Sequence, residues 1–139
     1  MSGAGGLSRT WTILYLVIRA LVGIPFLIAA WLEGMSSPQT LAELDLVWIP
    51  DAPLWLVRLV AGIEGLAALG LILPSLVRLP PVVVAVSAFV LLFVQIAALG
   101  FDRSAGSLGD LPAKAIVLGL TLIILWAELG RPSSDTSPP

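Results

Sequence analysis

An apolar segment from Leu54 to about Leu73 constrains the fold most strongly, because a carboxyl group lies near its middle. At about 1.5 Å per residue, a helix of this length crosses the roughly 30 Å hydrocarbon core of a bilayer. Glu64 lies near the midpoint, where a charged side chain costs at least about 2.5 kcal/mol unless protein surrounds it. The rest of the chain is therefore expected to shield this segment from lipid and to supply Glu64 with a partner.

Composition and hydropathy extend this interpretation to the whole chain. Of its 139 residues, 58% are hydrophobic and 12% are charged, whereas soluble domains carry about 25% charged residues. The sequence therefore predicts one all-α membrane domain at 11–130, a four-transmembrane-helix bundle with a short interfacial helix between spans 1 and 2. The spans are predicted at about 11–33, 54–74, 81–100 and 112–129.

The segments outside the spans differ in character. Residues 1–10 are small and polar and are predicted to form a flexible N-terminal lead, and 131–139 a disordered-type tail. Ser37-Pro38 is a good helix start, with Ser as the N-cap and Pro in the first turn. An interfacial helix is therefore predicted at about 37–48, and a polar loop with incidental leucines is the alternative.

The sequence contains no Cys and no His, so it supplies neither thiol redox chemistry nor Cys/His ligands for zinc or haem. Its net charge of −2 and lack of a basic run give nucleic acid nothing to bind. No nucleophile–base pair, phosphate loop or metal cluster is recognisable. We therefore predict no catalytic residues and no metal site, and favour a chain that is not an enzyme.

Ionisable residues inside the spans are the candidate site. Arg19 and Glu64 lie at similar depths in their spans, so they are predicted to contact each other near the midplane. This pair is either a structural ion pair that fixes the register of the bundle or part of a substrate or proton path. A second polar layer is predicted nearer the outer side, formed by Glu33, Arg58, Gln95, Asp102 and Lys114, and near the inner edge Glu128 is predicted to meet Arg78 or Arg131. The candidate buried polar cluster as a whole comprises Arg19, Glu64, Arg58, Gln95, Lys114 and Glu33.

Small residues mark candidate packing faces. Ala61-x-x-x-Gly65 in the second span and the pair Ala115 and Gly119 in the fourth have the spacing at which helices approach closely in membranes. Both pairs are predicted to lie at helix–helix contacts.

Several of these positions together resemble the DoxX-like family over roughly residues 13–129. The likeness rests on Arg19, Gly23 and Phe26 in the first span, Glu64, Gly70 and Arg78 around the second, and Lys114 and Gly119 in LPAKAIVLGLTLIILW. The resemblance implies a four-helix integral membrane protein, and some members of the family are associated with quinone-linked oxidoreductases. This chain has Ala30 and Glu33 at positions where the family commonly has a Gly and a Lys. It also lacks the His that is frequent in the third span of the family, where Gln95 is the nearest polar residue.

Three functions from different classes follow as hypotheses. The first is a non-catalytic accessory or structural subunit of a larger membrane complex, redox or energy-converting, with other membrane subunits and the lipid bilayer as partners. The second is a quinone- or lipid-binding component of a membrane oxidoreductase, and the third is a small transporter or channel. The predicted location is the bacterial cytoplasmic (inner) membrane with both termini cytoplasmic, because the interfacial segment and third loop hold most acidic residues.

Overall fold

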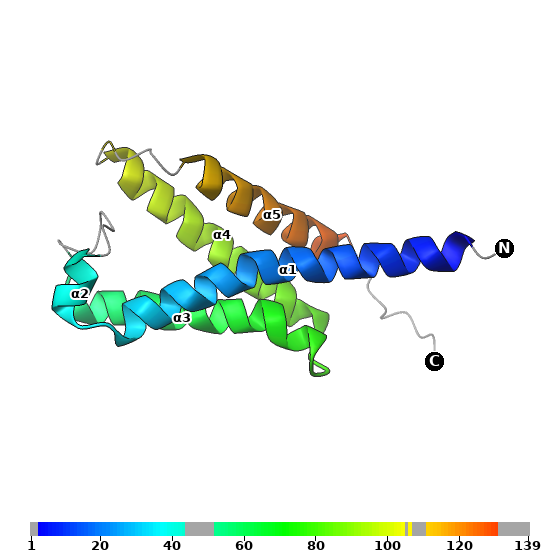
Figure 1. Cartoon of the computed structure of the whole chain (residues 1–139), viewed down its shortest axis with the longest axis horizontal. Helices are drawn as coiled ribbons and strands as arrows, with labels where there is room; N and C mark the ends of the chain where they lie inside the picture. Colours follow the sequence, from blue (N-terminus) through cyan, green and yellow to red (C-terminus); the bar gives the residue numbers. More distant parts are fainter. Residues whose placement is uncertain (1–2, 44–51, 105, 107–110, 131–139) are drawn as a thin grey trace, which may run out of the picture.

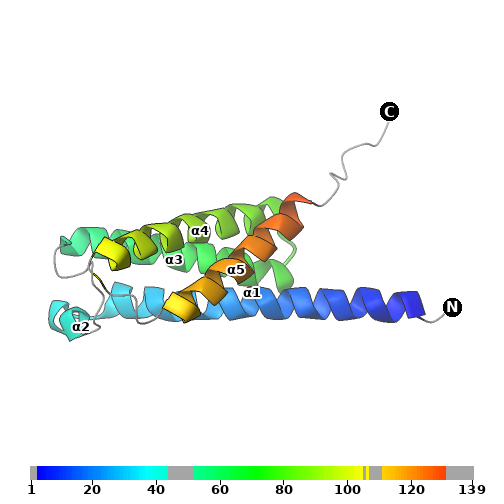
Figure 2. The ribbon, with the colours of Figure 1, turned by 90° about the horizontal axis from the view of Figure 1, so that it is seen from above.

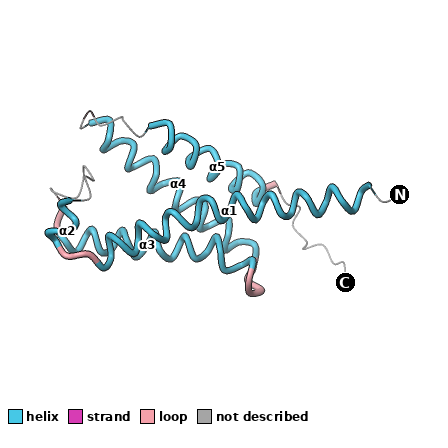
Figure 3. Tube along the Cα trace, viewed as in Figure 1, coloured by secondary structure: helices cyan, strands magenta, loops and turns pink. Residues whose placement is uncertain are grey.

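The computed structural model describes residues 3–43, 52–104, 106 and 111–130, and nearly all of these are helical (Figures 1 and 3). The helices are α1 (Gly3–Met35), α2 (Pro38–Glu43), α3 (Leu54–Ile72), α4 (Pro81–Ser104) and α5 (Leu111–Leu129), with a 3₁₀ turn at Leu73–Ser75. Four helices of the described chain are long and apolar enough to cross a membrane. The predicted all-α bundle of four transmembrane helices is confirmed.

Two helices are longer than the sequence predicts. α1 begins at Gly3, so most of the predicted flexible lead at 1–10 is helical. Each added residue of a formed helix gains a hydrogen bond, and the Thr10 hydroxyl donates back to the Gly6 carbonyl at 2.9 Å. This first part of α1 extends beyond the other helices (Figures 1 and 2). α4 continues one turn past its predicted end to Ser104.

The short helix α2 follows α1 directly and begins where the Ser37-Pro38 signal predicts. The Thr40 amide donates to the Ser37 hydroxyl at 3.2 Å, which is an N-cap contact, and Leu41 is buried. The remainder of the predicted interfacial helix, and the predicted tail at 131–139, lie outside the described residues.

α1 and α3 pack against each other in opposite directions along a seam of small residues. A Cβ atom built on Gly65 would lie 3.3 Å from the Ala30 Cβ, and one built on Gly34 would lie 3.7 Å from the Ala61 Cβ. The backbones approach closely because these side chains are small. Ala61-x-x-x-Gly65 is therefore a packing face, as predicted, and its counterpart on α1 is Ala30-x-x-x-Gly34.

α4 packs on α3, and α5 on α4, around an apolar core. Buried residues of all four spans form it: Val22, Ala67, Leu71, Val84, Ala88, Leu91 and Ile124. Gly70 of α3 lies directly against Ser87 of α4, so that even a methyl group at Gly70 would clash with the serine side chain. Toward the end that carries α2, α4 and α5 diverge from α1 and α3 (Figure 1).

α5 departs from the predicted packing. A Cβ atom built on Gly119 would have no neighbouring atom within 4 Å among the described residues. Ala115, one turn earlier, is exposed. The predicted small-residue face of the fourth span therefore contacts no other helix in the described part of the bundle.

Candidate functional site

The candidate polar residues lie at different levels of the bundle rather than in one cluster. Arg19 lies near the end where α3 finishes, and Arg58 and Glu33 lie near the end where α1 finishes. Gln95 bonds within the α4–α5 pair, and Lys114 pairs with the last turn of α4. Arg19 and Arg58 thus join α1 to α3, and Gln95 and Lys114 join α4 to α5.

Arg19 joins α1 to the last turn of α3. Its Nε–H donates to the Leu71 carbonyl at 2.8 Å in a buried contact. Carbonyls in the last turn of a helix have no further helical amide to bond, and a cation there is also favoured by the helix dipole. The guanidinium carbon lies 5.6 Å from the centre of the Tyr15 ring, within range of a cation–π contact. Arg19 therefore caps α3.

Tyr15 connects this end of the bundle to α5. Its hydroxyl donates to Glu128 Oε1 at 2.5 Å, so α1, α3 and α5 meet around one polar cluster. Glu128 is predicted near Arg78 or Arg131, and Arg131 lies outside the described residues, so this prediction stays open. A sequence signal existed for Tyr15, because it lies one helical turn before Arg19 on the same face.

Arg58 makes the corresponding contact at the other end of the α1–α3 pair. Its Nη1 donates to the Glu33 carbonyl at 2.8 Å and its Nη2 to the Ser36 carbonyl at 2.6 Å. Glu33 is in the last turn of α1, and Ser36 is the first residue after the helix. α1 and α3 thus cap each other's C-terminal ends through one arginine each.

Glu33 and Glu64 bury two carboxyl groups between these two arginines. Their exposed fractions are 6% and 7%, and when both groups are ionised the charge of Glu33 acts unfavourably on Glu64. In each side chain, Oε2 is buried without a hydrogen-bond partner among the described residues. An ionised carboxylate accepts hydrogen bonds and donates none, so two neighbouring ones cannot satisfy each other. This is the most strongly under-bonded place in the described chain.

The predicted contact between Arg19 and Glu64 does not fit this register. Arg19 lies at Leu71, and seven residues separate Leu71 from Glu64, about 10 Å along the helix axis. The charge that acts on Glu64 is that of Glu33. The prediction assumed equal depths counted from the predicted starts of the spans, but α1 begins eight residues before its predicted start.

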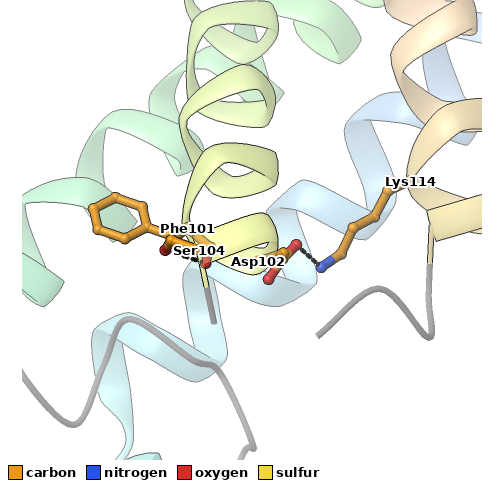
Figure 4. A network of polar contacts seen from close by, with 4 residues as sticks. All are labelled: Phe101, Asp102, Ser104 and Lys114. Carbon is orange, nitrogen blue, oxygen red and sulfur yellow. Dashed lines mark hydrogen bonds and ion pairs between the residues drawn. The ribbon is translucent and has the colours of Figure 1, made fainter. Parts of the chain in front are cut away.

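The other polar contacts tie α4 to α5. Gln95 Nε2 donates to the Thr121 hydroxyl at 2.8 Å, and that hydroxyl donates to the Val117 carbonyl at 2.8 Å. Lys114 forms an ion pair with Asp102, which lies in the extra turn of α4 (Figure 4). Sequence reasoning placed Asp102 and Lys114 in the same layer but missed Thr121, whose hydroxyl is inconspicuous in an apolar span.

The side chains of Arg19, Arg58, Gln95 and Lys114 thus join helices, whereas no described hydrogen bond is made by the carboxyl groups of Glu33 and Glu64. Among the described residues there is no group of three or more Asp, Glu, His or Cys side chains placed to hold a metal ion. The arrangement defines a helical membrane protein with an internal polar framework and one pair of under-bonded carboxyl groups.

Comparison with known families agrees with this class. The DoxX-like family matches residues 17–124, well over half of the chain. The chain belongs to the DoxX-like family. No curated protein and no solved structure matches it.

Proposed function

We propose that the chain is a non-catalytic accessory subunit of a larger membrane complex, and that α5 contacts the neighbouring subunit. The outer face of α5 carries this proposal. It is the stripe formed by Ala115, Gly119, Leu122 and Trp126, at offsets of four, seven and eleven residues. Nothing described fills the space beside Gly119. Small residues on a transmembrane helix allow another helix to approach closely.

The polar framework supports a structural role. The hydrogen bonds and ion pair described above join α1 to α3, α1 to α5, and α4 to α5. Groups used in this way hold helices in register. The family resemblance implies association with quinone-linked oxidoreductases for some members, so a redox or energy-converting complex is the partner class that we propose. The bacterial inner membrane, with both termini cytoplasmic, is the proposed location.

Substitution of Gly119 tests this role. Full-length tagged chain is purified from its native membrane in mild detergent, and co-purifying polypeptides are quantified. Gly119→Leu is expected to reduce the recovery of a stoichiometric partner at least fivefold, because the larger side chain prevents close approach of a second helix. Gly100→Leu is the matched control, since Gly100 of α4 also has no neighbour within 4 Å among the described residues. A chain that purifies alone, or equal partner recovery in both variants, would overturn the proposal.

A second candidate function is a small transporter for protons or cations, and the under-bonded Glu33–Glu64 pair favours it. Buried carboxyl groups within a membrane are typical of ion and proton paths. Vesicles reconstituted with the chain would then show proton or cation flux, and Glu64→Gln would abolish it. Flux no greater than that of empty vesicles removes this candidate.

A further inference from the structure

A groove runs along the outside of the α1–α3 pair. It encloses about 450 Å³ and is lined by Leu27, Ala30, Trp31, Gly34, Met35, Arg58, Ala61, Gly62 and Gly65. All of these residues belong to α1 or α3, so the groove faces away from α4 and α5. Gly62 keeps it open, because a Cβ atom built there would meet nothing within 4 Å.

The groove has an apolar body and one cationic end. Its lining is apolar except for Arg58, the one charged residue among the described lining residues. Arg58 lies four residues into α3, about 6 Å from the start of the helix. It also bonds the carbonyls of Glu33 and Ser36 at the end of α1. The cation therefore lies near the membrane interface, while the apolar part extends toward the midplane.

The guanidinium is held in place and still has donors to offer. Arginine carries five N–H donors in a planar fork, and the bonds to Glu33 and Ser36 use two of them. A guanidinium recognises phosphate oxygens well because its planar donors match their geometry. Basic groups between transmembrane helices near an interface are suited to anionic lipid headgroups. Trp31, which is exposed at the same end, suits the headgroup level.

We infer that the groove binds one anionic phospholipid, with an acyl chain against Gly62 and Gly65 and the phosphate at Arg58. The bilayer supplies this ligand directly. Charge complementarity selects an anionic headgroup, because the lining carries a positive charge and, in its described part, no negative one. The site is on α1 and α3, so it is independent of the proposed contact through the outer face of α5.

Native mass spectrometry of the detergent-solubilised full-length chain tests the site. Phosphatidylglycerol and phosphatidylcholine with identical acyl chains are titrated separately. One phosphatidylglycerol is expected to bind at least tenfold more tightly than phosphatidylcholine. Gly62→Leu is expected to remove that preference by filling the groove, and Gly119→Leu, the matched glycine of α5, to preserve it.

A second measurement uses the wild-type fold, so it does not depend on how Gly62→Leu folds. Trp31 lines the groove, and bromine on an acyl chain quenches nearby tryptophan fluorescence. Brominated phosphatidylglycerol is expected to quench the chain at lower lipid fractions than brominated phosphatidylcholine. Trp31→Phe is expected to abolish this difference.

Each alternative occupant gives a distinct result. Equal binding of the two lipids, unaffected by Gly62→Leu, would mean general lipid contact only and would overturn the inference. Loss of a co-purifying polypeptide in Gly62→Leu, without change in lipid preference, would assign the groove to a protein partner and would also overturn it. Loss of partner in Gly119→Leu bears on the proposed function alone.

Discussion

Glu33 and Glu64 are where the described side chains are least well satisfied. Each is more than nine-tenths buried, and each keeps one carboxyl oxygen without a hydrogen bond among the described residues. Burial of a charge is tolerated when a partner of opposite charge or several donors face it. Here the described charge that acts on Glu64 is that of another carboxylate, Glu33. The pair therefore opposes folding when both groups are ionised.

Removing one of these charges should stabilise the bundle. Glu64→Gln keeps the shape of the side chain and ends the repulsion, so we expect the free energy of unfolding to rise by about 1 kcal/mol, the order of a partly screened charge–charge interaction. This change in the free energy of unfolding is measured by unfolding the protein in mixed micelles with an increasing fraction of denaturing detergent. Glu43→Gln, at an exposed position of α2, is the control and should change little.

The same reasoning predicts how the two sites combine. Glu33→Gln alone should also stabilise, and Glu33→Gln with Glu64→Gln should add little beyond either single change, because one substitution already ends the repulsion. A loss of stability in either single variant would show instead that a partner satisfies the carboxylate in the folded protein.

At the scale of helices, the main feature is the reciprocal capping of α1 and α3. Arg19 of α1 bonds the end of α3, and Arg58 of α3 bonds the end of α1. Arg19 and Glu33 lie fourteen residues apart on α1, so the two contacts are about 20 Å apart. Between them runs the small-residue seam. The caps fix the register of the two helices, and the seam sets the distance between them.

Loss of one cap should cost more than loss of a surface charge. Arg58→Gln removes two charge-assisted, partly buried hydrogen bonds to carbonyl groups, and we expect the free energy of unfolding to fall by about 2 kcal/mol. Arg103→Gln, an exposed arginine in the last turn of α4, should cost less than about 0.5 kcal/mol. Equal losses in the two variants would mean that the cap contributes nothing specific.

Sequence reasoning located the helices better than the contacts between them. Apolar length predicted the four spans, the Ser37-Pro38 signal predicted the start of α2, and small-residue spacing predicted the Ala61–Gly65 face. The partner of Arg19 was missed because it is a backbone carbonyl, which every residue has and no residue pattern reveals. Depth within one span can be counted from a sequence, but the offset between two packed helices depends on where each one begins.

At the scale of the molecule, the four spans return the chain to the side on which it started. α1 begins and α5 ends at the same end of the bundle, while α2 lies at the opposite end (Figure 2). Both described chain ends therefore lie on one side of the membrane. Orientation toward the cytoplasm stays a prediction from the acidic residues of the loops.

Reporter fusions test this topology. Fusions after Gly6 and after Ser134 should report the same compartment, which we expect to be the cytoplasm, and fusions at Ser36 and at Gly106 should both report the opposite one. Disagreement between Ser36 and Gly106 would contradict four spans. If the two fusions of each pair agree but the Gly6 and Ser134 fusions report the side opposite to the cytoplasm, only the predicted orientation would be contradicted.

The reciprocal caps also bear on how the chain enters the membrane during synthesis. α1 leaves the ribosome before α3, so its arginine enters the membrane while the carbonyl that receives it has not yet been made, and a charged side chain within a span is costly without a partner. Domains assemble from the N-terminal side as they are synthesised. We therefore expect α1 to insert stably into the membrane only together with α3, so that this helical hairpin is the unit of insertion. α4 and α5 then pack against a pair of helices that is already complete.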